Sequence, residues 1–117
     1  MSNETEARIQ ASCVMWLWNE RPETRGRLFE VNNNPKNAID GARRKAMGMI
    51  AGVSDLILLR DGLPPLCIEM KDATGMQSKA QKDWQKIAES VGCDYVIIRS
   101  LSDFKEVLLK INCPRIK

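Results

Sequence analysis

Two acidic residues and a lysine stand at the ends of two neighbouring apolar runs of the sequence. Asp55 lies near the start of the run 53–59, and the run 66–71 ends with Glu69 and Lys71. An ionisable side chain within an apolar run is costly unless it has a partner. Two carboxylates on adjacent strands can hold a divalent cation, because hard cations such as Mg²⁺ prefer oxygen ligands. These residue types are therefore typical of metal-dependent phosphodiester hydrolysis.

The turn between the two runs predicts that these side chains meet. Residues 60–62 (Arg-Asp-Gly) carry the Asp-Gly hairpin signal, so Asp55 and Glu69 are expected on paired strands. Glu69 and Lys71 are two residues apart and therefore project from one face of their strand. The backbone carbonyl of Met70 between them is a natural additional metal ligand. Lys71 would orient or deprotonate an attacking water, or stabilise the transition state.

The same residues have an ordinary interpretation, which is an ion pair on an edge strand. For an acid-x-lysine triplet taken alone, that interpretation is the more common one. Asp55 favours the metal site over the ion pair, because it is an acid inside a second apolar run, and Gly52 directly precedes that run. The sequence therefore favours a metal site.

Two further side chains are candidates for the same site. Gln81 falls within the apolar stripe of a predicted helix, where an amide needs a hydrogen-bond partner. It is expected either to hold Lys71, a metal-bound water or a phosphate, or to be satisfied inside the fold. Glu6 is either a helix-capping residue together with Asn3 or an accessory metal ligand, directly or through water. Asn33 is expected to be a turn residue, with contact to the site as the alternative.

Basic residues cluster on two predicted helices and are candidate contacts to DNA. Lys79, Lys82 and Lys86 recur at i, i+3 and i+7 and so share one helix face. Such a face can follow a DNA backbone through its phosphates, and an ordinary solvated surface is the alternative for each residue singly. The other cluster consists of Arg43, Arg44 and Lys45.

The composition limits the chemistry that is possible. The sequence contains no histidine, which excludes Ser-His-Asp triads and histidine–metal nuclease sites. The four cysteines are widely spaced and form no C-x-x-C pair, so we expect buried thiols, not a zinc site or a disulfide framework. No apolar run is long enough to span a bilayer, and the first residues do not resemble a secretion signal. These features predict a cytoplasmic protein whose hydrolytic chemistry would depend on carboxylates, lysine and metal.

Residue patterns predict eight elements in the order α-β-α-β-β-α-β-α. Ser78 and Ser102 are the expected N-caps of the last two helices, and Pro64-Pro65 is expected to precede the third strand, because proline cannot donate within a sheet. The elements predict one α/β domain over residues 1–117, with helices packed on a mixed four-stranded sheet. Helices are expected at residues 3–19, 40–47, 78–91 and 102–114, and strands at 27–31, 53–59, 66–71 and 94–98.

Together these motifs resemble the VRR-Nuc family, a branch of the PD-(D/E)XK nuclease superfamily. The resemblance extends from about Glu6 to about Leu109. The series G-x-x-x-G-x-x-D, E-x-K and G-x-x-S-x-x-Q is specific, whereas E-x-K alone is not. Ser54 stands where many members have proline. The segments that carry the resemblance are G-M-I-A-G-V-S-D (48–55), I-E-M-K (68–71), G-M-Q-S-K-A-Q-K-D-W (75–84) and V-G-C-D-Y-V-I-I-R-S (91–100).

The resemblance implies a restriction-endonuclease-like core and Mg²⁺- or Mn²⁺-dependent hydrolysis of DNA phosphodiesters. Short stand-alone members resemble phage or prophage proteins and dimeric Holliday-junction resolvases. A two-fold dimer suits a four-way junction, because two symmetric sites must cut two strands. The roles implied are metal ligands for Asp55 and Glu69, the catalytic lysine for Lys71, a supporting glutamine for Gln81 and the first-helix acid for Glu6.

The expected function is that of a structure-selective DNA endonuclease, a homodimer that resolves four-way junctions in the cytoplasm of a bacterial host. Two alternatives remain open. One is a restriction-like, nicking or flap nuclease. The other is a nucleic-acid-binding module that lacks activity, although the presence of every catalytic residue type argues against it.

Overall fold

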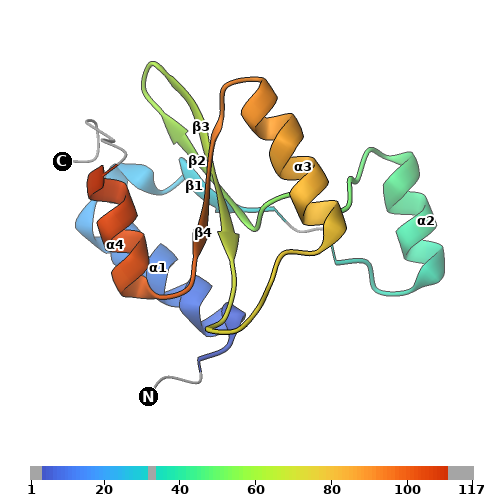
Figure 1. Ribbon diagram of the computed structural model, residues 1–117, viewed down its shortest axis with the longest axis horizontal. Coiled ribbons are helices and arrows are strands. Elements are labelled where there is room, and N and C mark those ends of the chain that lie inside the picture. The colour runs from blue at the N-terminus through green and yellow to red at the C-terminus, as the bar shows by residue number, and fades with distance from the viewer. Residues whose placement is uncertain (1–3, 32–33, 111–117) are drawn as a thin grey trace.

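The computed structural model describes residues 4–31 and 34–110, and the expected order of helices and strands is confirmed (Figure 1). Asn3, Asn33, Cys113 and Pro114 lie outside the described residues. The elements are α1 (Glu6–Glu20), the short 3₁₀ helix η1 (Pro22–Thr24), β1 (Leu28–Glu30), α2 (Ala38–Ala46), β2 (Leu56–Arg60), β3 (Leu63–Met70), α3 (Lys79–Ser90), β4 (Asp94–Ile98) and α4 (Leu101–Lys110).

The four strands form one mixed sheet in the order β1-β2-β3-β4. β1 and β3 both run antiparallel to β2, so the predicted hairpin between β2 and β3 is confirmed. β4 runs parallel to β3, and α3 makes the crossover between them. Figure 1 shows α1 and α4 on one side of the sheet and α3 on the other. The predicted α/β class with a mixed four-stranded sheet is therefore confirmed.

The hydrophobic core lies between the sheet and the helices α1 and α4. Alternate strand residues point into this layer, because successive side chains of a strand project to opposite faces. Glu69 and Lys71 therefore project to the other face, toward α3. The core is formed by Leu28, Leu56, Leu58, Leu66, Ile68, Met70 and Ile98 from the sheet, Ile9, Cys13 and Leu17 from α1, and Phe104 and Leu108 from α4.

Three of the predicted helix starts differ from the observed ones, since α1 begins at Glu6, α2 at Ala38 and α4 at Leu101. Thr5 caps α1, since its side chain accepts a hydrogen bond from the Arg8 N–H at 3.2 Å. The predicted cap Ser102 is wrong, because α4 begins one residue earlier, at Leu101. The hydroxyl of Ser100 accepts from the Asp103 N–H at 3.0 Å and satisfies the first turn instead.

The prediction that Pro64 and Pro65 precede the third strand is also wrong. β3 begins at Leu63, which pairs with Arg60 of β2 beyond an irregularity in the register. β4 begins opposite Leu66, so within residues 4–31 and 34–110 no strand pairs with the two prolines on that side. On the side of β2, the register is irregular between Leu58 and Arg60, opposite the two prolines, and prolines are tolerated at an edge or an irregularity of this kind.

α2 stands away from the sheet, at the far side of α3 (Figure 1). None of its residues is buried. Asn37 caps its N-terminus, and Asp40 forms ion pairs with Arg43 and Arg44 at 3.1 and 2.9 Å. The helix is therefore held by local interactions.

The three cysteines within the described residues are free thiols, and two of them are buried, as expected. Cys13 and Cys67 are buried free thiols, and Cys93 is a half-buried free thiol. Within residues 4–31 and 34–110, no helix combines the length and the apolar character that crossing a membrane requires.

Candidate active site

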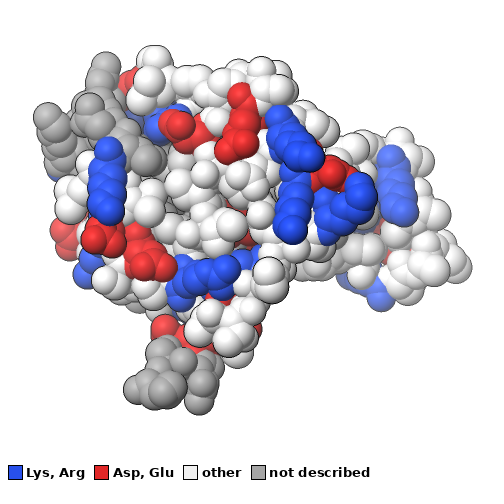
Figure 2. All heavy atoms as spheres, in the orientation of Figure 1, with Lys and Arg blue, Asp and Glu red and all other residues white. Residues whose placement is uncertain are grey.

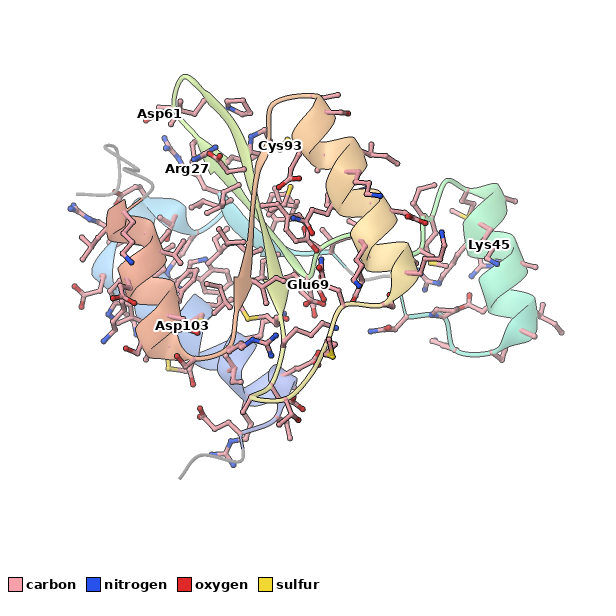
Figure 3. The ribbon with its side chains drawn as sticks, in the orientation of Figure 1. Arg27, Lys45, Asp61, Glu69, Cys93 and Asp103 are labelled. Atoms are coloured by element: carbon pink, nitrogen blue, oxygen red, sulfur yellow. The ribbon has the colours of Figure 1, made fainter. Side chains whose placement is uncertain are left out.

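The structure brings Asp55, Glu69 and Lys71 together at one end of the β2–β3 hairpin. Asp55 directly precedes β2, and its Oδ2 accepts a hydrogen bond from the Met70 N–H at 2.7 Å. This bond ties the start of β2 to the end of β3, where Glu69 also lies. Figure 3 shows Glu69 between the sheet and α3.

Glu69 is a buried carboxylate with unequal oxygens. Only 1% of the residue is exposed. Its Oε2 accepts from the Gln81 amide at 2.8 Å and lies 3.6 Å from the Lys71 Nζ. Among the described residues, its Oε1 is buried and has no hydrogen-bond partner. A buried carboxylate oxygen without a partner is costly, so this atom is the first place to look for a ligand.

Burial and the neighbouring carboxylate change how Glu69 titrates. Burial and, next in size, the negative charge of Asp55 together raise the pKa of Glu69 to about 8. Burial also raises the pKa of Asp55, while the Met70 N–H opposes that shift. The two carboxyl groups are within hydrogen-bonding distance, so a proton held by Glu69 can bridge them. A divalent cation can replace such a proton between two acids.

The capping box at the start of α3 directs the Gln81 side chain into the site. Ser78 and Gln81 form a capping box, in which the Gln81 N–H donates to the Ser78 hydroxyl at 3.2 Å. The Gln81 side-chain oxygen accepts from the Ser78 N–H at 2.8 Å, which leaves its NH₂ group to face Glu69. The capping box therefore fixes the amide. Its observed partner is Glu69, whereas Lys71, one of the expected partners, forms no hydrogen bond with it in the described chain.

Gly52 allows the chain before Asp55 to lie against the start of α3. Its φ is +88°, in the region that glycine adopts readily. A Cβ atom at this position would be 2.3 Å from the carbonyl oxygen of Ala80 and 2.8 Å from the backbone nitrogen of Gln81. The close approach explains why a glycine stands here, and it brings Asp55 and Gln81 to the same place.

A hollow of about 430 Å³ opens at these groups and is strongly acidic. Besides Asp55 and Glu69, it is lined by Glu6 from the first turn of α1 and Glu30 from the end of β1. Glu6 contributes to the raised pKa of Glu69, and Glu30 to that of Asp55. An acidic hollow of this kind attracts cations.

Glu30 is the site residue that the sequence did not indicate. It ends a short strand and pairs in register with Leu56, the residue after Asp55. Its carboxylate accepts from the Gln10 amide at 3.3 Å. The only available signal was an acid at the end of a strand, and strand pairing was needed to place it beside Asp55.

The donor set fits Mg²⁺ or Mn²⁺. Across the described parts of the chain, no three His, Cys, Asp or Glu side chains are grouped closely enough to hold a metal ion by themselves. Mg²⁺ is commonly bound by one or two carboxylates together with water and substrate phosphate, and Asp55 and Glu69 provide the two carboxylates. The unpartnered Oε1 of Glu69 supports this fit. The Met70 carbonyl and Glu6 remain predicted ligands.

The predicted DNA contacts lie on the surfaces of two helices. Figure 2 shows basic side chains gathered over α3, with others on α2. Several are already paired: Lys79 contacts Asp83 at 2.8 Å, and Asp40 holds both arginines of α2. In the described chain, the basic residues of these two clusters that form no ion pair are Lys45, Lys82 and Lys86.

No family model matches this sequence, and no curated protein matches it. A solved structure named "VRR_NUC domain protein" has a similar fold, with a TM-score of 0.77. The similarity covers 94% of this chain and 89% of that chain, at 22% sequence identity. The two proteins therefore share a fold, and the expected fold class is confirmed by a known structure.

Proposed function

We propose that this protein is a Mg²⁺- or Mn²⁺-dependent deoxyribonuclease that hydrolyses phosphodiesters in branched DNA. The observation that carries the proposal is the buried Glu69, which lies beside Asp55 and Lys71 and has an unpartnered oxygen. A fold shared with a protein named for a VRR_NUC domain supports a nuclease-type domain.

Asp55 and Glu69 would hold the cation, with the Met70 carbonyl as an additional ligand and Glu6 acting through water. When bound, the cation makes a water molecule more nucleophilic and neutralises negative charge on the phosphate. The carboxylates are held before any ligand arrives, because the Met70 N–H fixes Asp55 and the Gln81 amide fixes Glu69. Such preorganisation avoids reorganising the site during the reaction.

Lys71 is the group that would act on the attacking water or on the phosphate. Its ammonium lies 3.6 Å from Glu69 Oε2, and only 8% of the residue is exposed. A positive charge held in a partly water-excluded site stabilises developing negative charge far better than one in bulk water. Lys71 therefore orients the water, or stabilises the charge that builds on the phosphate oxygens.

The basic surfaces would hold the DNA backbone while the acidic hollow receives one phosphate. Lys82 and Lys86 are exposed on the face of α3 that Lys79 begins, and Lys45 is exposed on α2. Contacts of this kind orient DNA without reading its sequence, which suits an enzyme that recognises shape. A two-fold dimer would place two such sites on the two strands of a four-way junction. The cytoplasmic, phage-encoded setting implied by the resemblance remains a prediction.

The proposal is tested by incubating the protein with four-way junction, flap, nicked and linear duplex DNA. Each DNA is assayed with Mg²⁺, with Mn²⁺ and with a chelator, and light scattering gives the mass in solution. We expect metal-dependent cleavage, with the junction cut most rapidly by a dimer. Lys71→Ala should bind the junction but not cut it. If the wild-type protein cuts none of these DNAs with either metal, the nuclease proposal fails. Cleavage by a monomer would overturn only the dimeric junction-resolving assignment.

A further inference from the structure

The loop that follows Lys71 is held by one side chain from the far end of β4. Arg99 directly follows β4, and its Nη1 donates to two backbone carbonyls of the loop, those of Asp72 at 2.7 Å and Gly75 at 2.8 Å. A single guanidinium nitrogen thus joins both ends of residues 72–75. In the described chain, Arg99 forms no ion pair, and its side-chain hydrogen bonds go to these two carbonyls.

The loop is also folded tightly within itself. The Oδ1 of Asp72 accepts from the Thr74 N–H at 3.1 Å and from the Gly75 N–H at 2.6 Å. Asp72 therefore closes the turn from inside, a common role for aspartate. Arg99 closes the same turn from outside.

The closed loop lies against the side chain of Lys71. A Cβ atom added to Gly75 would be 3.3 Å from the Cδ of Lys71 and 3.0 Å from the Oδ1 of Asp72. The Gly75 backbone therefore lies beside the aliphatic part of Lys71, and this contact helps to explain why a lysine is only 8% exposed. The ammonium is thereby confined to the side of the sheet on which Glu69 lies.

Arg99 is itself fixed from both directions. The preceding residue, Ile98, accepts from the Lys71 N–H at 3.0 Å, so β4 and Lys71 are joined next to the guanidinium. The Arg99 N–H donates to the Asp103 Oδ2 at 3.2 Å, which ties Arg99 to the first turn of α4. The donor that closes the loop is therefore anchored to the sheet and to a helix.

We propose that Arg99 is a positioning residue for Lys71, and that it acts by clamping residues 72–75 against the lysine side chain. The expected effect on turnover rests on the proposed nuclease function. The clamp itself concerns only the position of the Lys71 side chain. Because a displacement of about 1 Å at a reacting group can cost about 100-fold in rate, opening the clamp should lower turnover and leave DNA binding intact.

The clamp is tested first without any reference to cleavage, by the rate at which an amine-labelling reagent modifies Lys71, measured by mass spectrometry of peptides. Arg99→Ala should raise that rate several-fold, and Arg99→Lys should raise it less, since one ammonium can still reach a carbonyl. Arg60→Ala is the matched control. Arg60 also donates to a backbone carbonyl, that of Pro64, but at the opposite end of the sheet. It should leave Lys71 labelling unchanged.

The second measurement separates turnover from binding on the DNA that the wild-type protein cuts fastest. Arg99→Ala should lower kcat about 10- to 100-fold while the Kd for that DNA changes less than about 3-fold. Gly75→Ala, whose new Cβ would press on Lys71 while the carbonyl that accepts from Arg99 is retained, should lower kcat in the same way. Unchanged labelling of Lys71 in a folded Arg99→Ala protein would overturn the clamp. A loss confined to Kd would show instead that Arg99 contacts DNA. If wild type cuts no DNA but the labelling rises as expected, the nuclease proposal fails and the clamp stands.

Discussion

Both ends of the β2–β3 hairpin carry charged side chains, but the charges are compensated by partners of opposite sign at only one end. At the turn end, Arg60 donates to the Pro64 carbonyl at 2.9 Å and to Asp94 at 3.0 Å, although its side chain is only 3% exposed. Arg27 and Asp61 form a second pair there at 3.2 Å, and Figure 3 shows them together, away from Glu69. Each acid at this end faces an arginine, so the buried charge is compensated.

At the other end, Asp55 and Glu69 face each other with one lysine nearby. Glu6 and Glu30 add further negative charge to the same hollow. Burial raises the pKa of both central acids, and one oxygen of Glu69 has no partner in the described chain. The turn end of the hairpin, where each acid is paired with an arginine, is therefore the satisfied end. The end at which Glu69 lacks a partner for one oxygen is the unsatisfied end. Unsatisfied groups of this kind cost stability and are typical of functional sites.

Glu69→Gln gives the largest expected difference between the two ends. It removes a metal ligand but keeps the size of the side chain, so we expect metal-dependent cleavage to fall by about 1,000-fold or more. Above about pH 8, where Glu69 is ionised, stability should not fall, because a neutral amide is easier to bury beside Asp55 than a charge is. Cleavage rate and thermal unfolding of the same preparation check both outcomes.

Asp94→Asn is the matched control at the satisfied end. It removes one carboxylate from the Arg60 pair and should lower stability by about 1 kcal/mol, with little effect on cleavage. If Asp94→Asn reduces cleavage as much as Glu69→Gln does, the functional difference between the two ends is contradicted.

The pH dependence of stability distinguishes the two ends without a substrate. The pKa of Glu69 is raised by burial and by Asp55 from 4.5 to about 8 in the folded protein. Between these values the folded state binds more protons than the unfolded state, so stability should decrease as pH rises from about 5 to about 8. Mg²⁺ should restore stability most strongly at the upper end of this window, because it replaces the proton.

Unfolding temperatures of the metal-free protein across this range, with and without Mg²⁺, check the prediction. Glu69→Gln should remove most of the decrease and leave the smaller contribution of Asp55, whose pKa burial also raises, whereas Asp94→Asn should leave the decrease unchanged. A wild-type profile that is flat across the window would show that Glu69 is not protonated in the fold.

Local patterns were enough to predict the fold and the centre of the site. The Asp-Gly turn predicted the pairing that brings Asp55 to Glu69, and the two-residue spacing predicted that Lys71 shares a face with Glu69. These features depend on a turn and on strand alternation, which are properties of neighbouring residues.

Features that depend on residues distant in sequence were missed. The sequence left the partner of Gln81 open, and its bond to Glu69 depends on the approach of α3 to the chain at Gly52. Glu30 was missed because its place depends on the pairing of β1 with β2. No local pattern contains either of these contacts.

Gly52→Ala should perturb the unsatisfied end through packing. The new Cβ would lie 2.3 Å from the Ala80 carbonyl oxygen, on a residue with a φ of +88°. Relief requires α3 to move away from the loop, which we expect to destabilise the fold by about 3 kcal/mol and to displace Gln81 from Glu69.

Gly62→Ala gives the matched control at the turn end. Gly62 also has a positive φ, +68°, but a Cβ there meets nothing within 4 Å. It should therefore cost only about 1 kcal/mol, the strain of the backbone alone. Chemical denaturation of both variants checks the difference, and equal losses would show that the contact with α3 is unimportant.

Lys82→Ala should have the smallest effect and concerns how DNA reaches the unsatisfied end. Lys82 lies near the start of α3 and forms no ion pair in the described chain, so its charge is available to a phosphate. One lost phosphate contact should weaken junction binding several-fold at low salt and lower the salt dependence of log Kd by about 0.9.

Lys110→Ala, at the last residue of α4, is the control and should change neither quantity. Because α3 starts at the Glu69 end and α4 finishes at the turn end, equal effects of the two variants would mean that DNA does not distinguish the ends of the sheet. A slope that changes only for Lys82→Ala places the DNA backbone along α3, beside the hollow that Asp55 and Glu69 line.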